Sequence, residues 1–380
     1  SISQELKMED KRLQQDIQKK VAARLNPLFN RYQVDQESLD AIMKWKSTVL
    51  MLGNFSSGKS TLINEMLGHD IQRTGQSPTD DAFTIITAPE QGKDPEDKPG
   101  STILNDDRLP FTSLKKYGDR LAAHIQLKEI PVPDLEKLAI IDTPGMLDAV
   151  TEKDRGYDYA RVIGDLAKLA DLVVLMFDPH KAGTIKEVYN TIRHTLPENV
   201  GEDRIVYVMS RIDECENPAD MVRSYGTLCW NLSQMTGRKD IPRIFLTFSP
   251  TATKNPDALE IWIDERNELK QRIIKAPRLR INHILQHIDK QANELRMIIE
   301  AMATFSKKGR DIFIKTMRTG SIMALFFFFF LDVILRQLFD IPAQTMLSAA
   351  FAGELAPPNF IFPVIGLAGS LGLAGLWFTR

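Results

Sequence analysis

One stretch near residue 50 limits the possible fold more than any other part of the chain. Residues 48–62 read TVLMLGNFSSGKSTL, in which a short apolar run is followed by a loop of the form G-x-x-x-x-G-K-[ST] and then by a helical pattern. A strand, a glycine loop and a helix in this order form a phosphate-binding loop, because the glycines let successive backbone N–H groups point at one phosphate cluster. The sequence therefore predicts a nucleotide site in an α/β fold.

The residues of this loop have distinct expected roles. Lys59 would give a positive charge to the β- and γ-phosphates of a nucleotide, and the Ser60 hydroxyl would reach Mg²⁺. The nucleotide-binding residues expected from the loop are Gly53, Asn54, Phe55, Ser56, Ser57, Gly58, Lys59, Ser60 and Thr61.

A second motif, IIDTPG, lies at residues 140–145, about 80 residues after the loop. An apolar strand that ends in Asp142 places a carboxylate at the edge of the sheet where the phosphate loop lies. There Asp142 would hold Mg²⁺ through water, and the Gly145 N–H would sense the γ-phosphate. The two motifs together predict one nucleoside-triphosphate site.

A switch segment is expected between these motifs, at Ser77-Pro-Thr-Asp-Asp-Ala-Phe83. Thr79 would give a hydroxyl to Mg²⁺ and a carbonyl to the attacking water, with Asp80 as the alternative residue for this task. A turn or a helix cap is the other interpretation of the segment. The predicted catalytic residues are thus Lys59, Thr79, Asp80 and Gly145, and the predicted metal ligands are Ser60, Asp142 and Thr79.

Base recognition is expected directly after the strand at 204–209, at residues 210–213 (SRID). Guanine-specific sites generally read N/T-K-x-D, in which the Asp binds the N1–H and N2–H of the base. Here Asp213 is present, Arg211 replaces the Lys, and Ser210 replaces the Asn or Thr. Ser249, which follows the strand at 244–248, is the fourth residue expected near the base. This pattern does not decide between guanine and adenine.

Strand and helix patterns alternate from residue 47, which predicts a mostly parallel sheet covered by helices. The segment 91–110 is rich in Pro, Gly and charge and is expected to be a surface loop. The predicted strands are Thr48–Leu52, Phe83–Ala88, Leu138–Ile141, Leu172–Phe177, Arg204–Met209 and Ile244–Phe248.

These motifs, with several others, make the chain resemble the dynamin superfamily, and more closely its Eps15-homology-domain (EHD) ATPase branch, over roughly residues 20–305. The further motifs that carry the resemblance are Arg155-Gly-Tyr-Asp-Tyr159, LVVLMFDPHK (Leu172–Lys181), MVRSYGTLCWNL (Met221–Leu232) and Lys275-Ala-Pro-Arg278. None of them is a general motif of GTP-binding domains. The resemblance implies a dynamin-type nucleotide domain with a helical stalk whose tip touches lipid.

The resemblance also implies roles for single residues. Phe55 occupies the position of the catalytic glutamine of dynamins, and EHD proteins have a bulky apolar residue there too, so slow hydrolysis is expected. Family members dimerise through a helix with an exposed tryptophan, here Trp230, although an aromatic residue on an amphipathic helix also suits a core position.

The chain departs from the family pattern at three places. The second threonine of the family's switch is Asp80, so which hydroxyl meets Mg²⁺ is open. The N-K-x-D motif has become SRID at residues 210–213; since EHD proteins bind adenine nucleotides, ATP is favoured over GTP, without excluding GTP. Within these residues no Eps15-homology calcium-binding module follows the helices, and an apolar segment follows them instead.

Two amphipathic helices are expected to flank the nucleotide domain, at residues 4–30 and 276–305, with a break near Pro27. The second has apolar residues at alternating spacings of four and three, which suits pairing with another helix. The first helix is the expected partner, in one helical arm; an isolated oligomeric coiled coil is the alternative.

The composition changes after residue 306. A basic stretch precedes the apolar residues Ile322–Leu331, and a second apolar stretch, Phe360–Phe378, contains no charge and is nearly long enough to span a bilayer. The first stretch is only about 11 residues long before Asp332, which makes it a poor span unless Asp332 and Arg336 are paired or interfacial. Lys and Arg flank the pair of stretches but are absent from 341–358, which places both flanks on the cytoplasmic side. A helical hairpin buried in a soluble core is the alternative to a membrane hairpin.

The sequence thus predicts four segments: an N-terminal helical segment (1–46), a dynamin-type nucleotide domain (47–252), a helical stalk (253–318) and a membrane-inserting or transmembrane hairpin (319–380). The expected function is slow, Mg²⁺-dependent hydrolysis of ATP or GTP, coupled to dimerisation, self-assembly and membrane remodelling on the cytoplasmic face. A membrane-anchored signalling GTPase and a nucleotide-binding membrane scaffold are the alternatives. A net charge of −2 with no basic face argues against a nucleic-acid partner.

Overall fold

The computed structural model describes residues 2–32, 43, 45–54, 57–71, 82–145, 156–180, 204–215, 217–236, 241–250, 253, 256–340 and 344–379. The chain forms two compact units, residues 1–293 and residues 294–380. Each unit is described separately below.

The first unit is built on an eight-stranded sheet in the order β3-β4-β2-β5-β1-β6-β7-β8. Neighbouring strands are parallel except for the pairs β2–β5 and β3–β4. The strands are β1 (Ser47–Gly53), β2 (Phe83–Thr87), β3 (Lys98–Pro99), β4 (Ile125–Glu129), β5 (Leu138–Asp142), β6 (Leu172–Phe177), β7 (Ile205–Met209) and β8 (Ile244–Leu246).

The central strands β1, β5, β6 and β7 are buried along their whole length. A strand covered on both faces needs apolar side chains at nearly every position, which is why these strands are continuous apolar runs rather than alternating ones. All six strands predicted from the sequence are confirmed. The strands β3 and β4 were not predicted, because β4 alternates between buried and half-exposed residues and β3 has only two residues.

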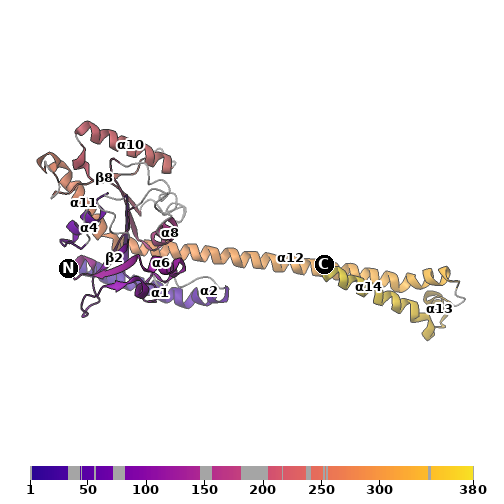
Figure 1. Ribbon diagram of the computed structural model, residues 1–380. Coiled ribbons are helices and arrows are strands. Elements are labelled where there is room, and N and C mark those ends of the chain that lie inside the picture. Colours follow the sequence, from indigo (N-terminus) through magenta and orange to yellow (C-terminus); the bar gives the residue numbers. More distant parts are fainter. Residues whose placement is uncertain are drawn as a thin grey trace. The chain divides into compact units, whose positions relative to one another are not determined.

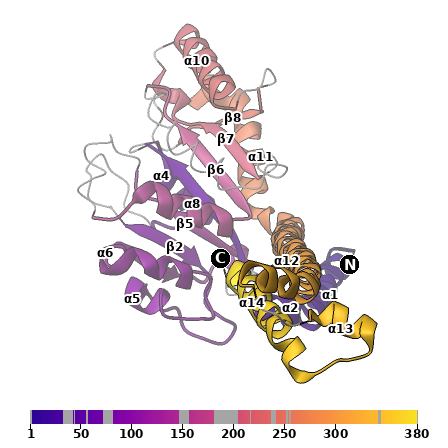
Figure 2. The ribbon, with the colours of Figure 1, turned by 90° about the vertical axis from the view of Figure 1, so that its right-hand side faces the viewer.

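Helices cover both faces of this sheet. Leu62, Ile63 and Leu67 of α4 (Lys59–Leu67) pack with Val49 and Met51 of β1 in one core cluster, to which α11 (Ile263–Ile274) also contributes. The helix α8 (Tyr159–Leu169) covers the other face, and α10 (Pro218–Thr236) lies beside β8 (Figure 2). The shorter elements are α5 (Gly100–Ile103), α6 (Gly118–Ala122), η1 (Thr112–Tyr117), η2 (Pro133–Leu135), η4 (Ile212–Glu214), η5 (Pro256–Trp262) and η6 (Ala276–Leu279).

The expectation that residues 91–110 form only a surface loop is wrong for the second half of that segment. Residues 93–97 are exposed, but β3 pairs with β4, and α5 begins at the buried Gly100. A Cβ at Gly100 would lie 2.2 Å from the Ala122 carbonyl oxygen, so this glycine permits a close backbone contact that the composition did not reveal.

The N-terminal helix has the predicted break. It is divided into α1 (Ile2–Arg24) and α2 (Asn26–Tyr32), and Pro27 is the second residue of α2. Proline is tolerated in the first turn of a helix but not in its interior, so the chain starts a new helix there.

A buried carboxylate fixes the start of the long helix α12 (Arg280–Leu338) to the sheet. Asp171 is fully buried and accepts hydrogen bonds from the Ser47 hydroxyl at 2.7 Å and the Thr48 amide at 3.0 Å. His283 Nδ1 lies 2.5 Å from the second carboxylate oxygen, and Arg280 lies 3.5 Å from the first. These contacts join the first residues of β1, β6 and α12.

The charges around Asp171 determine its ionisation. Burial acts to raise the pKa of Asp171, but the hydrogen bond and charge of His283 and the charge of Arg280 outweigh it and hold the pKa below its ordinary value. The Asp171 carboxylate is therefore ionised in the folded protein. For the neighbouring Arg204, burial lowers the pKa of the guanidinium to about 10.

The second unit contains the rest of α12, α13 (Met346–Ala352), η7 (Pro357–Phe360) and α14 (Ile361–Thr379). Figure 1 shows α14 beside the last part of α12, and a Cβ at Gly366 would lie 2.9 Å from Leu331 and 3.0 Å from the Phe327 carbonyl oxygen. Glycine at this position lets the two helices approach closely.

Among the described residues, one helix is long and apolar enough to cross a bilayer. It ends at Leu338 and contains an 18-residue window of mean hydropathy 1.9. A membrane hairpin remains a prediction.

An ion pair lies inside this second unit. Asp332 and Arg336 are both buried, with 2.5 Å between Oδ1 and Nε. Asp332 Oδ2 accepts a hydrogen bond from the Met346 amide at 2.6 Å, and the Arg336 guanidinium donates to the Pro358 carbonyl at 3.3 Å and lies over the Phe362 ring. The pair thus connects α12 with the start of α13, with η7 and with α14.

Replacing Asp171 with alanine should lower the free energy of unfolding by about 3–5 kcal/mol, because Arg280 and Arg204 would stay buried without its negative charge. Since the folded pKa of Asp171 is lowered, its contribution should be complete above the unfolded value of about 3.9 and be lost as pH falls through the folded pKa. Denaturant unfolding of the detergent-solubilised chain, followed by tryptophan fluorescence between pH 3 and pH 7, measures both effects.

Asp106→Ala is the matched control, since Asp106 forms an exposed pair with Arg108 that is expected to contribute at most about 1 kcal/mol. Equal destabilisation by the two substitutions would contradict the role of Asp171.

Candidate functional site

The phosphate loop connects β1 to α4, and its backbone depends on two glycines. A Cβ at Gly53 would lie 2.4 Å from the Ser57 hydroxyl oxygen and 2.7 Å from the Met176 carbonyl oxygen, so no side chain fits there. Gly58 has φ of +79°, a left-handed conformation that side chains disfavour, and α4 begins at the next residue. The Ser57 hydroxyl is buried and has no hydrogen-bond partner among the described residues, as suits a loop built to bind phosphate oxygens.

Lys59 is the first residue of α4 and is buried. Its ammonium group donates to the Gly53 carbonyl at 3.0 Å and to the Asn54 carbonyl at 3.2 Å. These bonds hold the charge over the loop, where the N-terminus of α4 also favours an anion. The lysine therefore lies where the predicted phosphate contact needs it, and that role remains a prediction.

Ser60 and Asp142, predicted from two separate motifs to share a metal ion, lie in contact. The Ser60 hydroxyl donates to Asp142 Oδ2 at 2.8 Å, although 82 residues separate them. Thr143, the next residue of IIDTPG, donates to the Met51 carbonyl at 2.8 Å, and the Tyr159 hydroxyl donates to the Pro144 carbonyl at 2.8 Å. A hydroxyl and a carboxylate oxygen beside a phosphate loop fit Mg²⁺, which prefers one or two protein oxygens together with phosphate and water.

The segment expected to recognise the base lies against the phosphate loop. Ser210 is bonded to the end of β6, since its amide and its hydroxyl both donate to the Phe177 carbonyl, at 2.9 and 3.0 Å. Arg211 has φ of +55°, and its Cγ would lie 3.9 Å from a Cβ at Gly58. Its guanidinium pairs with Glu214 and lies 3.7 Å from Asp178. Burial raises the pKa of the Asp213 carboxyl above its ordinary value.

Two residues near this segment, Glu65 and Arg266, were missed by the sequence reasoning. The predicted residue Ser249 donates to Glu65 of α4 at 2.5 Å, and Glu65 also pairs with the buried Arg266 of α11. Arg266 donates to the Phe248 carbonyl at 3.1 Å, so the phosphate-loop helix is joined to the residues after β8. No motif could have revealed these contacts, because their members lie 184 and 201 residues apart.

Some predicted site residues lie outside the described residues. These are Phe55 and Ser56 of the loop and Thr79 and Asp80 of the switch segment. Gly145 is half-buried and is the last residue of the described range 82–145. The roles of these five residues, like those of the described site residues, remain predictions.

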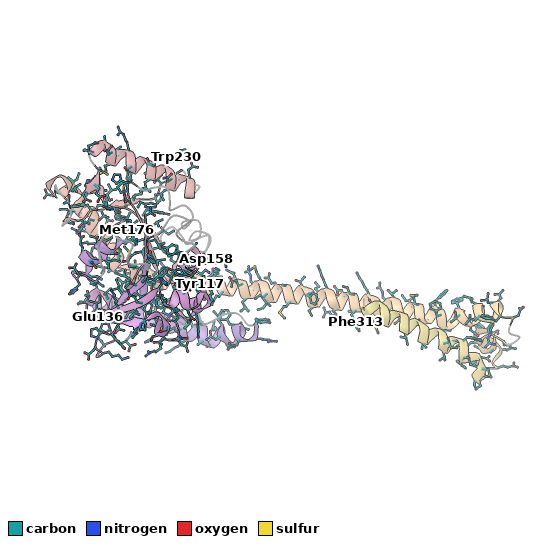
Figure 3. All side chains as sticks on the ribbon, in the orientation of Figure 1. Tyr117, Glu136, Asp158, Met176, Trp230 and Phe313 are labelled. Atoms are coloured by element: carbon teal, nitrogen blue, oxygen red, sulfur yellow. The ribbon has the colours of Figure 1, made fainter. Side chains whose placement is uncertain are left out.

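Trp230 lies on α10 (Figure 3). Its surface is 66% exposed, and that of Val222 on the same helix is 65% exposed. The alternative that Trp230 is a core residue is therefore wrong for this structure. The core side of α10 is formed instead by Leu228 and Leu232, which are buried.

Gly53→Ala should abolish nucleotide binding, because the added methyl group collides with the Ser57 hydroxyl and the Met176 carbonyl and displaces the loop. Gly92→Ala is the matched control: Gly92 also has a positive φ, of +83°, but nothing lies within 4 Å of its Cβ position. Titration with a fluorescent ATP or GTP analogue measures the effect. Equal affinities of the two variants would contradict the geometry described for the loop.

Comparison with known proteins finds relatives of the region that contains this site. Residues 49–211 match the sequence profile of the dynamin family. EH domain-containing protein 1 from Homo sapiens is 28% identical over 279 residues, which are 72% of this chain and 51% of that protein. EH domain-containing protein 2 from Arabidopsis thaliana is 27% identical over 271 residues, 69% of this chain and 48% of that protein.

Among solved structures, the LeoA bacterial dynamin GTPase from ETEC aligns over 93% of this chain and 60% of that chain, with 14% identity and a TM-score of 0.35. The chain spans about half the length of the curated relatives it matches. The matched region runs from β1 to Arg211 and includes the phosphate loop and IIDTPG. Residues 49–211 therefore form a dynamin-type nucleotide-binding domain, and the chain is similar to the EH domain-containing proteins.

Proposed function

We propose that this protein is a membrane-bound nucleoside triphosphatase that hydrolyses ATP or GTP slowly and remodels the membrane on which it assembles. The observation that carries the proposal is the contact between Ser60 and Asp142 beside the loop that holds Lys59. This arrangement would bind a triphosphate and Mg²⁺ in one place, and residues 49–211 match the dynamin family, a resemblance that implies a nucleotide-dependent membrane protein.

Each residue of the site then has a task. The loop amides and Lys59 bind the phosphates and stabilise the negative charge of the transferring phosphoryl group. Ser60 and Asp142 would hold Mg²⁺, which neutralises phosphate charge when bound. Gly145 and Thr79, or Asp80, would position the switch segments and the attacking water.

The base contact is proposed to involve Ser210, Arg211, Asp213 and Ser249. Arg211 lies near the loop. In this proposal its side chain would lie along the ring of the base. The raised pKa of Asp213 reflects a partly buried carboxyl, which a base N–H could pair with. ATP is favoured because the similar EHD branch uses adenine nucleotides despite an N-K-x-D motif.

The exposed face of α10 is the proposed dimer interface. Trp230, Val222 and Tyr225 are exposed apolar residues on this one helix, and large exposed aromatic residues are typical anchors of protein interfaces. Dimerisation there would be coupled to nucleotide binding, as the resemblance implies.

Membrane attachment is proposed for residues 319–380, on the cytoplasmic face. Phe326, Phe329 and Phe330 point outward from α12, while Phe327 and Phe328 are half-buried. Apolar side chains exposed around a helix suit lipid rather than water. The basic residues between 307 and 318 would lie at the headgroups of anionic lipids.

Lys59→Ala should reduce nucleotide hydrolysis at least about 100-fold, because it removes the charge that stabilises the transferring phosphoryl group. The measurement is phosphate release from ATP and from GTP, with and without liposomes, together with electron microscopy of the liposomes. Lys93→Ala, at an exposed pair with Glu90, is the matched control and should behave like the unmodified chain.

Turnover and liposome deformation that both survive Lys59→Ala would refute the proposal. Binding without any phosphate release above the Lys59→Ala background would instead indicate a nucleotide-binding scaffold.

Trp230→Ala should weaken nucleotide-dependent dimerisation about 30-fold or more, as expected for a buried interface anchor worth at least about 2 kcal/mol. Sedimentation of the detergent-solubilised chain with a non-hydrolysable triphosphate measures the dimer. Ile261→Ala is the control, because it removes an apolar residue of η5 that is even more exposed than Trp230. Identical dimer fractions for both variants would exclude α10 as the interface.

A further inference from the structure

A hydrogen bond joins the motif IIDTPG to the first residue of α8. The Tyr159 hydroxyl donates to the Pro144 carbonyl at 2.8 Å, and both residues are buried. This carbonyl belongs to the peptide group between Pro144 and Gly145, whose N–H is expected to sense the γ-phosphate. The tyrosine thus contacts the backbone group that carries the predicted nucleotide contact.

The planarity of this peptide group relates the hydroxyl to the N–H. The peptide bond is trans, as are all those that the structure describes, so its carbonyl and its N–H point in opposite directions. The carbonyl points to Tyr159 at the start of α8, which covers the face of the sheet opposite to α4 (Figure 2). The Gly145 N–H is therefore directed away from α8, toward the side of the sheet on which α4 begins.

Few torsions are left that could turn this peptide group. The Thr143 hydroxyl donates to the Met51 carbonyl at 2.8 Å, which holds the residue before Pro144 to β1. The proline ring fixes φ of Pro144 at about −65°, so ψ of this residue is the main rotation that redirects the Gly145 N–H. The hydrogen bond from Tyr159 fixes that rotation.

The Tyr159 side chain is itself held in place. Asp158 caps α8 by accepting from the Arg161 amide at 3.1 Å, so the backbone of Tyr159 has a fixed position at the helix start. The Tyr159 ring stacks on the buried Phe83 ring of β2, with 5.9 Å between the centroids and 26° between the planes. The hydroxyl is therefore preorganised, as a group that orients another must be.

We propose that Tyr159 is a positioning residue whose hydroxyl keeps the Gly145 N–H in the direction that binds the γ-phosphate. This inference rests on the proposed function, which assigns the γ-phosphate contact to Gly145. Without the hydroxyl the peptide group populates other orientations, and the affinity for a triphosphate falls in proportion to the fraction of chains that keep the binding orientation. A diphosphate has no γ-phosphate, so its affinity is unchanged.

A hydroxyl that only satisfied a buried carbonyl would act differently. Its loss would lower the stability of the fold and would weaken the binding of diphosphate and triphosphate equally or not at all. The ratio of the two affinities therefore distinguishes a positioning role from a structural one.

Tyr159→Phe tests this role, because it removes the hydroxyl and keeps the ring that stacks on Phe83. Calorimetric titration of the detergent-solubilised chain with AMPPNP and ADP, and with GMPPNP and GDP, measures the ratio in the presence of Mg²⁺. The ratio of triphosphate to diphosphate affinity should fall about three- to tenfold, as expected for the loss of one hydrogen bond. An unchanged ratio, or an equal loss for both ligands, would overturn the proposal.

Tyr117→Phe is the matched control. The Tyr117 hydroxyl also donates to a residue of α8, the Asp165 carboxylate, at 2.7 Å, so this variant removes one hydrogen bond from the same helix. It should keep the affinity ratio of the unmodified chain. An equal fall of the ratio in both variants would show that any weakening of α8 has this effect, and would contradict a specific role of Tyr159.

A measurement without nucleotide separates this inference from the proposed function. The sequence contains two Pro–Gly pairs, Pro99–Gly100 and Pro144–Gly145, so carbonyl-¹³C proline and ¹⁵N glycine together give one NMR correlation for each pair. Tyr159→Phe should shift the Pro144–Gly145 signal, whose carbonyl loses a hydrogen bond. The Pro99–Gly100 signal, from the junction of β3 and α5, should stay in place and reports that the fold is intact.

A Pro144–Gly145 signal that does not move would overturn the contact with Tyr159, whether or not the chain binds a nucleotide. A shifted signal in a chain whose unmodified form binds no triphosphate would refute the proposed function, and with it the γ-phosphate role of Tyr159, while the contact itself would stand.

Discussion

The nucleotide site depends on the register of three parallel strands. Met51 of β1 lies beside Asp142 of β5, and Gly53 of β1 lies beside Met176 of β6. The first alignment sets the carboxylate within 2.8 Å of Ser60, and the second brings a backbone carbonyl so close to Gly53 that only glycine fits. A shift of one residue in either pair would separate Ser60 from Asp142 and close the loop against β6. The positions of the loop's chemical groups therefore depend on the register of the sheet.

The strand β6 connects this site with the helical part of the first unit. It follows Asp171, whose carboxylate binds Ser47, Thr48, His283 and Arg280, and it ends at Phe177, whose carbonyl binds Ser210. The start of α12 is thus held at the N-terminal end of β6, and the segment expected to bind the base is held at its C-terminal end. Fully satisfied buried polar groups of this kind fix one arrangement of their elements, because any other would leave a charge unpaired.

Contacts that one short stretch of sequence encodes were predictable, and contacts between distant stretches were not. The loop, IIDTPG and six strands were identified because a buried parallel strand and a glycine loop each have a local pattern. The strand β4, the Glu65–Ser249–Arg266 cluster and the Asp171–His283 contact were missed, since polar residues there look like surface residues until the fold pairs them. The exposure of Trp230 was not decidable either, because the spacing of α10 allows an aromatic residue on either side.

In the C-terminal apolar segment, too, a contact that the sequence does not reveal changes the interpretation, here of how long the first apolar stretch is. Counting charges along the sequence ends the first apolar stretch at Asp332, after about 11 residues. In the structure Asp332 and Arg336 are buried and paired one helical turn apart, and the outer surface of α12 continues with Ile334 and Leu338, which are exposed. A paired charge inside protein costs a membrane helix much less than one that faces lipid. The apolar outer surface therefore extends beyond Asp332, which makes α12 long enough for a bilayer where the linear count made it too short.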